Sequence, residues 1–268
     1  MKTEKLRSVL LVAIFLTSSS YTLCAEEAID ASDPTKVYTY AGVGVKYTDY
    51  TNDETMKEMR AVGNIGLSPN DMLLFEVGYG WHDGDRVEGG NSALTNGRLR
   101  WFHLFEMDYS VTSGYRGWAT QVDLQIAGIM KGTDGQNVLS IGALPAFGIN
   151  ESWSFFLPMN VVNSWDKEFK NYNGLGLNVS PLLVYTSDWW EGAYVQIWPG
   201  YTYFVSGELK KEGSGNLDLT TGGAITDTIW WALTYQKNFD VDLKSFRHGS
   251  DTGLNNDQNI FFNVTTYF

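Results

Sequence analysis

Cysteine and proline are both scarce in this sequence of 268 residues, which contains one cysteine, Cys24, and 6 prolines. A single cysteine excludes an internal disulfide framework and a Cys-based metal site. Long apolar runs are also missing, because no segment approaches the roughly 18 consecutive apolar residues of a membrane-spanning helix. Basic residues number 19 against 31 acidic ones, and this excess of negative charge argues against nucleic acid as a partner.

The N-terminus has the residue order of a secretory signal peptide. Lys2, Lys5 and Arg7 precede an apolar run over residues 9–16, and residues 17–20 are small and polar. This order is typical of export signals, and the apolar run is too short to cross a bilayer as a helix. The sequence therefore predicts an exported precursor.

We expect cleavage after Ala25, which makes residues 1–25 the signal peptide and residues 26–268 one mature domain. Three basic residues and one acidic residue leave with the signal, so the mature domain has 30 acidic and 16 basic residues and a net charge of −14. A lipoprotein would use Cys24 as its acylated residue, but Leu23 is not the small residue that normally precedes such a cysteine. Residues 26–35 are expected to form a flexible lead-in to the mature domain.

Aromatic residues and glycine are abundant, with 10 Trp, 15 Tyr, 14 Phe and 28 Gly. This composition favours β-strands and membrane-interface aromatic girdles over a helical soluble enzyme. The last ten residues, Asn259 to Phe268, alternate between two faces and stop on an aromatic residue. They resemble the C-terminal recognition strand of outer-membrane barrel proteins, in which the barrel assembly machinery reads the terminal Phe. The alternative is an ordinary amphipathic strand at the end of the sequence.

A lipid-facing strand alternates apolar and polar residues, since one side touches hydrocarbon while all backbone groups pair inside a closed barrel. Residues 72–82 follow this pattern with Leu73, Phe75 and Val77 on one side and Glu76 and Gly78 on the other. About 12 segments pass the same test. They lie near residues 37–48, 57–67, 72–82, 97–110, 117–130, 138–148, 153–163, 175–185, 191–205, 216–225, 228–239 and 259–268.

The connections between these segments alternate between short turns and longer polar loops. Short periplasmic turns and long outer loops are typical of bacterial barrels, and an even number of strands places both termini in the periplasm. The sequence thus predicts an all-β fold, a transmembrane antiparallel β-barrel of about 12 strands in the cell outer membrane. Its expected partners include outer-membrane lipid and lipopolysaccharide.

Charged residues on the inward side of the predicted strands are candidates for a pore lining. A basic patch from neighbouring strands could steer an anionic or polar solute past carboxylates on the other wall. Alternatively, Arg and Glu pair and plug a narrow lumen. The candidate pore-lining residues are Lys46, Glu58, Arg60, Glu76, His82, Arg98, Arg100 and Asp123, and Glu106, Asp108 and Asp218 also count as inward.

Five inward aromatic residues, Tyr194, Trp198, Phe204, Trp230 and Tyr267, could form a stacking track for sugars or aromatic solutes. The alternative, which we favour, is that they fill volume inside the barrel. Gln196 and Gln236 are the polar partners that a sugar track would have.

Some residues conflict with the strand pattern. His103 points to lipid in the register of Leu99 and Trp101, so either a bulge intervenes or the strand parity slips after Phe102. Pro145, Pro158, Pro181 and Pro199 lie inside predicted strands, where each removes a ladder donor, and we expect bulges there.

The hypothesis of catalytic activity rests on His248-Gly249-Ser250 in the last long loop. The spacing is similar to the His-x-Ser motif of outer-membrane lipid A deacylases, in which His activates the Ser hydroxyl. The resemblance covers three residues of one loop, and a solvated loop histidine explains it as well. We therefore expect no catalytic residues, no metal site and no cofactor.

The layout with Gly117-Trp118-Ala119-Thr120-Gln121 before the fifth strand resembles transporter-like outer-membrane proteins associated with phenol-degradation operons. The resemblance lies in the rhythm of strands and turns and transfers no functional residue. The leading prediction is a porin-like channel for passive diffusion of small polar solutes. An occluded barrel with a structural or surface-interaction role is the runner-up, followed by a lipid hydrolase.

Overall fold

A computed structural model of the protein describes residues 29–50, 55–82, 92–128, 136–187, 190, 192–240 and 258–268. Fourteen strands cover most of these residues, and none of the described residues forms a helix that is long and apolar enough to cross a membrane. The strands are β1 (Tyr40–Asp49), β2 (Thr55–Ser68), β3 (Asp71–His82), β4 (Ser92–Phe105), β5 (Gly114–Ala127), β6 (Gln136–Gly148), β7 (Trp153–Phe156), β8 (Met159–Asp166), β9 (Tyr172–Val179), β10 (Leu182–Ser187), β11 (Ala193–Phe204), β12 (Gly213–Ala224), β13 (Ile229–Asp240) and β14 (Gln258–Tyr267).

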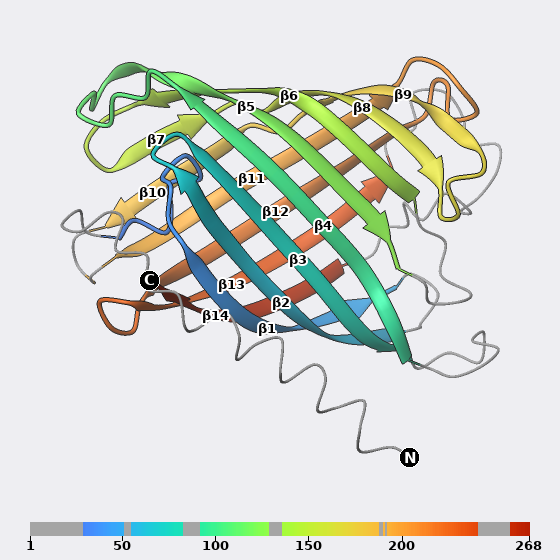
Figure 1. Cartoon of the computed structure of the whole chain (residues 1–268), viewed down its shortest axis with the longest axis horizontal. Helices are drawn as coiled ribbons and strands as arrows, with labels where there is room; N and C mark the ends of the chain where they lie inside the picture. The colour runs from blue at the N-terminus through green and yellow to red at the C-terminus, as the bar shows by residue number, and fades with distance from the viewer. Residues whose placement is uncertain are drawn as a thin grey trace.

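The strands form one closed antiparallel barrel (Figure 1). The first and last strands pair along their whole length, from Tyr40 opposite Tyr267 to Asp49 opposite Gln258. β7 and β8 together make one crossing of the wall, and so do β9 and β10, because β6 pairs with both β7 and β8 and β11 pairs with both β9 and β10. The 14 strands therefore make twelve crossings, which confirms the predicted all-β barrel.

Prolines explain the two divided crossings. Pro158 precedes β8 and Pro181 precedes β10, and neither has a backbone N–H to give to the ladder. Pro145 and Pro199 lie at the same level in the neighbouring strands β6 and β11, so four adjacent crossings share a line of prolines. The expected bulges are wrong at Pro158 and Pro181, which interrupt strands, and at Pro145 and Pro199, which stay in register with Trp118 and Leu217.

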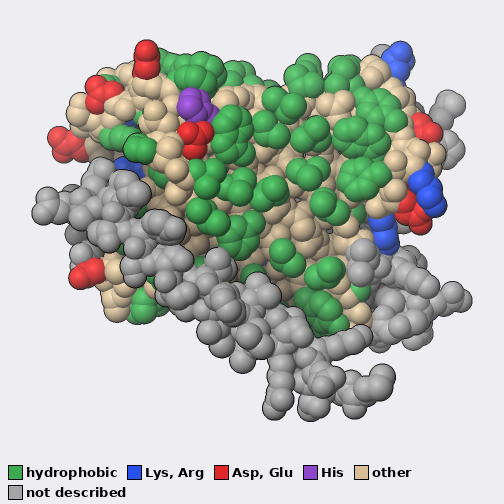
Figure 2. Space-filling view, viewed as in Figure 1, with side chains coloured by type: hydrophobic (Ala, Val, Ile, Leu, Met, Phe, Trp, Pro, Cys, Tyr) green, Lys and Arg blue, Asp and Glu red, His purple; other side chains and the backbone are tan. Residues whose placement is uncertain are grey.

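The outer surface of the barrel is an apolar belt. Side chains that point outward include Val43, which is 65% exposed, and Met59, Val77 and Leu177. Figure 2 shows apolar side chains across the middle of the visible face and charged side chains at its two ends. A closed ladder with this belt meets both demands of a bilayer, which are paired backbone groups and an apolar contact surface.

The two ends of the barrel differ. One end, here called the turn end, holds the start of β1, the end of β14 and short connections such as residues 69–70 and 225–228. The opposite end, here called the loop end, holds the connections that follow β1, β3, β5, β8, β11 and β13. Glu106 and Asp108 were predicted to face inward on a strand over 97–110, but β4 ends at Phe105 and Glu106 turns the backbone with a φ of 49°.

His103 does face outward, and neither a bulge nor a parity slip accounts for it. β4 pairs with β5 without a register shift from Asn96 to Phe105. The His103 Nδ1 lies 2.9 Å from Oδ1 of Asp71, and Oδ2 of the same carboxylate accepts a hydrogen bond from the Ser68 hydroxyl. Its ring contacts Phe105 with centroids 4.4 Å apart. An interfacial polar pair beside aromatic rings is compatible with the edge of an apolar belt.

Inside the barrel, the half near the turn end is filled by an apolar core. The core residues come from six strands and include Met72 and Phe102, which are almost completely buried. Their neighbours in this lumen core are Leu104, Ala119, Leu144, Ala146, Phe156, Leu182 and Val184. The barrel is therefore packed like a soluble protein at this end of its lumen.

Residues 29–39, here called the N-terminal segment, are tied into the same half of the barrel. Thr35 has 0% exposure, and Val37 packs against the lumen core. Gln196 of β11 donates to the Ser32 carbonyl at 2.8 Å, and Tyr109 donates to the Thr35 carbonyl at 2.9 Å. The expected flexible lead-in is thus wrong for the described part of residues 26–35.

Candidate functional site

The half of the lumen toward the loop end contains two adjoining cavities. The larger has a volume of about 410 Å³ and the smaller about 360 Å³. Arg98, Gln125, Gln136 and Gln236 line both cavities and mark the boundary between them. Pro34 of the N-terminal segment lines the larger one. Volumes of this size lie within the range of small-molecule sites, about 300–1,000 Å³.

Arginines and carboxylates from β2 to β5 form a continuous ladder on one wall. Arg60 places Nε 2.6 Å from Glu58 Oε1 and Nη1 3.1 Å from Glu76 Oε2. Arg98 continues the ladder, with Nη1 3.7 Å from Glu76 Oε1 and Nη2 2.6 Å from Asp123 Oδ2. The strand register brings these groups together, since Glu76 is opposite Arg98.

Arg100 ends the ladder, with Nη2 3.2 Å from the same Asp123 Oδ2. Its own register partner on β5 is Asp123. A single carboxylate therefore pairs with two guanidinium groups, while each arginine has at least one acidic partner. This geometry is that of the paired arrangement rather than of an uncompensated basic patch.

A bulge and a glycine shape the start of this ladder. The register of β3 and β4 shifts so that Thr95 has no partner residue, and its hydroxyl donates to Glu58 Oε2 at 2.5 Å. Gly78 lies next to this carboxylate, and a Cβ there would be 2.7 Å from Glu58 Cδ. The missing side chain at position 78 thus provides the space that buries Glu58, which is 3% exposed.

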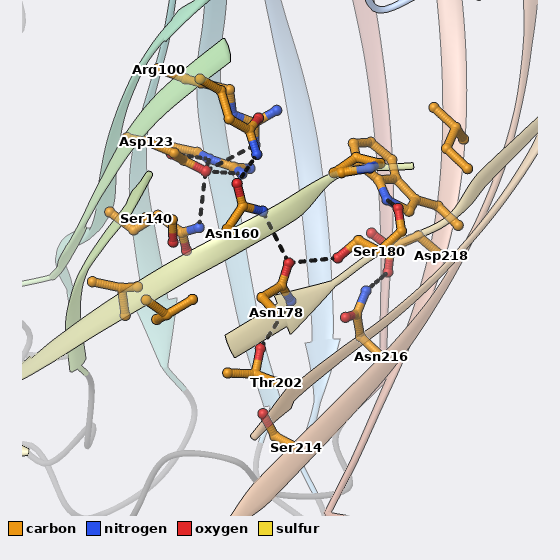
Figure 3. Close-up of a pocket in the computed structure, with 18 of the residues that line it drawn as sticks. Arg100, Asp123, Ser140, Asn160, Asn178, Ser180, Thr202, Ser214, Asn216 and Asp218 are labelled. Atoms are coloured by element: carbon orange, nitrogen blue, oxygen red, sulfur yellow. Dashed lines mark hydrogen bonds and ion pairs between the residues drawn. The ribbon is translucent and has the colours of Figure 1, made fainter. Parts of the chain in front are cut away.

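The opposite wall carries amides and hydroxyls instead of ion pairs (Figure 3). Gln121 donates to Asn160 Oδ1 at 2.5 Å, and Asn160 donates to Asn178 Oδ1 at 3.2 Å. Asn178 in turn donates to Thr202 Oγ1 at 3.0 Å and accepts from the Ser180 hydroxyl at 2.9 Å. Neutral polar groups on β5, β8, β9 and β11 are thereby joined in one series of hydrogen bonds.

Asp218 is the only carboxylate among the described residues that line the larger cavity away from the ladder. Its Oδ1 accepts from Asn216 Nδ2 at 3.0 Å and from Gln236 Nε2 at 2.9 Å. Gln236 also accepts from Asn259 at 2.8 Å. These amides extend the neutral wall to β12, β13 and β14.

The inward aromatic residues divide into two groups. Tyr194, Trp230 and Tyr267 form a buried cluster, against which Ile29 and Tyr38 pack, and so they fill volume near the turn end. Trp198 and Phe204, by contrast, line the larger cavity. Trp198 Nε1 donates to the Ser180 carbonyl at 2.9 Å, which fixes the position of its indole ring.

Burial shifts the pKa of one ionisable group in the N-terminal segment. Desolvation raises the pKa of the Asp33 carboxyl above its ordinary value, although the Thr35 hydroxyl and backbone N–H both donate to it. Asp30 raises this pKa further and Lys36 opposes that effect. Burial of the segment therefore disfavours the charged form of this carboxyl.

Seven of the eight predicted pore-lining residues lie at the lumen. Lys46 lines the smaller cavity, and the other six, Glu58, Arg60, Glu76, Arg98, Arg100 and Asp123, make up the ladder. His82 ends β3, and its side chain lies outside the described residues. The motif His248-Gly249-Ser250 also lies outside them.

Sequence reasoning missed the neutral wall. Asn160, Asn178, Thr202 and Asn216 line the larger cavity, and none of them was a candidate. The alternation that selected the inward charges also marks these residues as inward, so uncharged polar residues on the inner side were the available signal. Ser180 lies in an interruption between strands, where no alternation exists.

No protein-family model matches the sequence, and no curated protein is significantly similar to it. Solved structures are similar in fold. An outer membrane channel from Pseudomonas putida F1 superposes with a TM-score of 0.56 at 12% identity, covering 91% of this protein and 100% of the channel. The NanC porin gives 0.55 at 7% identity over 85% of this protein and 100% of the porin, and the KdgM porin gives 0.53 at 8% identity over 85% and 99%. The protein thus has the fold of outer-membrane β-barrels.

Proposed function

We propose that this protein is an outer-membrane channel that passes small hydrophilic solutes by diffusion. The observation that carries the proposal is the pair of polar-lined cavities in the lumen, about 410 and 360 Å³. Twelve crossings enclose more space than the eight whose side chains readily fill a barrel. The similarity in fold to two porins and a channel supports this function.

The proposal includes the biogenesis expected from the sequence. Export would remove residues 1–25, the apolar belt would embed the mature protein in outer-membrane lipid and lipopolysaccharide, and the assembly machinery would read the strand that ends at Phe268. The side chain of Phe268 is 68% exposed, so it is accessible for such recognition.

A second candidate function, that of an occluded barrel, is supported by the filled half of the lumen. The lumen core and the N-terminal segment fill the half of the barrel near the turn end. A barrel closed there permanently would have a structural or surface-interaction role. In the channel proposal, by contrast, the N-terminal segment must leave its place for solute to pass.

Liposome swelling separates the two functions. Proteoliposomes that contain the refolded full-length protein should swell in isosmotic solutions of small sugars at rates that fall with solute size. The barrel must first be shown to be folded by its heat-dependent shift on unheated gels. Swelling no faster than in protein-free liposomes, with folded protein, would reject the channel and favour the occluded barrel.

A further inference from the structure

The charges of the two lumen cavities balance. Four basic residues of the described ranges line them, Lys46, Arg60, Arg98 and Arg100, and four acidic residues do so, Glu58, Glu76, Asp123 and Asp218. The three arginines are bonded directly to Glu58, Glu76 and Asp123. Paired charges in contact present little net field to a passing solute, so this lining does not select for one sign of charge.

A charged solute would lose free energy of hydration on entering this lumen. To gain a partner for its own charge it must break or share an existing ion pair, because the ladder carboxylates already form ion pairs with guanidinium groups at 2.6–3.2 Å. Without such a partner, the charged group of the solute would lose its hydrating water and gain no ion pair in return. An uncharged solute avoids both costs.

The neutral wall offers what an uncharged polar solute needs. Asn160 donates one amide hydrogen to Asn178 at 3.2 Å, and Asn216 and Gln236 each donate one to the Asp218 carboxylate at 3.0 and 2.9 Å. Each side-chain amide has two hydrogens and two lone pairs, so capacity remains for a solute. A hydroxyl donates and accepts together and therefore matches such mixed groups.

The indole ring of Trp198 provides an apolar face beside these amides. It is half-buried, lines the larger cavity and is oriented by its bond to the Ser180 carbonyl. The C–H face of a sugar ring can cover an aromatic ring while its hydroxyls reach polar groups at the rim, as in sites that combine apolar walls with a few placed polar groups.

Resting on the proposed channel function, we propose that the larger cavity binds an uncharged polyhydroxylated solute, a sugar or polyol. The sugar ring would lie on Trp198, and its hydroxyls would bond to the amides of Asn160, Asn216 and Gln236. The ladder of ion pairs on the other wall would discriminate against acidic and basic sugars. Charge balance and the neutral wall together assign this class of solute.

Three matched sugars test the charge preference. Glucose, glucuronate and glucosamine share one ring and differ in charge, and their binding to the folded full-length protein can be measured by saturation-transfer NMR in a detergent without a sugar headgroup. We expect glucose to bind at least about tenfold more tightly than either charged sugar, the equivalent of about 1.4 kcal/mol. Equal or tighter binding of glucuronate or glucosamine would overturn the proposal.

Two variants test the location. Trp198→Leu removes the aromatic face, and Asn216→Leu replaces an amide by an apolar group with the same branching. Each should weaken glucose binding by about tenfold, while Trp81→Leu on the outer surface should not. Unchanged binding in a folded Asn216→Leu variant would show that glucose binds elsewhere, and this holds even if Trp198→Leu does not fold.

The outcomes also separate this site from the channel function. If liposomes with the protein swell in glucose but no sugar binds, the binding site is rejected and the channel stands. If glucose binds with the expected preference but does not pass, the site stands and the channel is rejected. Binding in detergent needs no transport, so neither result depends on the other.

Discussion

At the scale of single residues, the packing of the lumen wall depends on glycines that leave room for neighbouring side chains, as well as on charge. A Cβ at Gly78 would lie 2.5 Å from Thr95 Oγ1 and 2.7 Å from Glu58 Cδ, and it would also contact the Asn96 side chain. A Cβ at Gly97, on the neighbouring strand, would meet no atom closer than Ile126 Cβ at 4.0 Å. Two glycines of the same wall thus differ in what surrounds them.

We predict that Gly78→Ala destabilises the barrel by about 1–3 kcal/mol, because the added methyl group overpacks the buried end of the ladder. Gly97→Ala is the matched control and should change stability by less than about 0.5 kcal/mol. Urea unfolding in micelles measures both. Equal stability of the two variants would mean that Glu58 moves away without cost.

Asp33 makes the docking of the N-terminal segment depend on pH. Its pKa is raised by burial, so the docked segment binds the proton more tightly than the free segment does. Docking should therefore be strongest below the ordinary carboxyl pKa of about 3.9 and should weaken as pH rises through the raised value. Asp33→Asn should remove this dependence. Protection of the segment against protease across this pH range provides the measurement, and identical profiles for both proteins would contradict the prediction.

Side-chain parity was sufficient to find the ladder from the sequence, because Glu58, Arg60, Arg98 and Arg100 lie on regular strands. It did not show that these residues pair, since pairing depends on which residue of the next strand is opposite. The bulge at Thr95 also could not be predicted from alternation. Register is a property of strand pairs, whereas alternation is a property of one strand.

Among the elements, the N-terminal segment lies between two apolar clusters inside the barrel. Val37 contacts the lumen core on one side, while Ile29 and Ala31 contact the aromatic cluster on the other. The segment therefore fills the gap between two apolar groups that belong to different walls. Its removal should leave a path between them, because the barrel strands begin only at Tyr40.

We predict that replacing residues 29–36 by an equally long Gly-Ser sequence increases the rate of solute passage by at least about tenfold. The substitute keeps the length of the segment and loses the apolar contacts and the buried Thr35. Single-channel conductance and liposome swelling give the measurement. A mutated control, Lys210→Ser at the loop end, should behave as wild type, and an unchanged conductance after the Gly-Ser replacement would place the barrier in the lumen core instead.

The strands themselves were largely predictable, because a membrane wall requires alternation along every crossing. The burial of the N-terminal segment could not be predicted, since residues 29–36 are mostly polar or small and show no periodicity. Their burial depends on hydrogen bonds such as Gln196 to Ser32, which join residues far apart in sequence. The two strand interruptions follow from Pro158 and Pro181, for which a bulge was the wrong expectation.

For the whole molecule, we expect Phe268 to matter more for cellular assembly than for folding. This residue is 68% exposed, and its backbone N–H donates to the Thr39 carbonyl at 3.0 Å. Removing this residue loses one hydrogen bond and little packing. We predict near-normal refolding in detergent but a severalfold loss of assembled barrel in cells, measured by the heat-dependent gel shift. Equal losses in both settings would assign Phe268 a structural role alone.

The two ends of the barrel predict its orientation in the membrane. Asn70 is exposed at the turn end and Lys210 is exposed at the loop end. Cleavage of the signal would remove Cys24, so a cysteine introduced at either position would be the single thiol of the mature protein. Long loops of bacterial barrels face outward, so we expect Lys210 outside the cell and Asn70 in the periplasm.

We predict that Lys210→Cys reacts with an impermeant maleimide on intact cells, whereas Asn70→Cys reacts only after the outer membrane is opened. Both positions are exposed in the folded protein, so a difference in labelling reports the side of the membrane and not burial. The reagent must be larger than the lumen cavities, because a small one could enter through the barrel. Labelling of Asn70→Cys alone on intact cells would show that the barrel has the opposite orientation. The two lumen cavities, which lie toward the loop end, would then be on the periplasmic side.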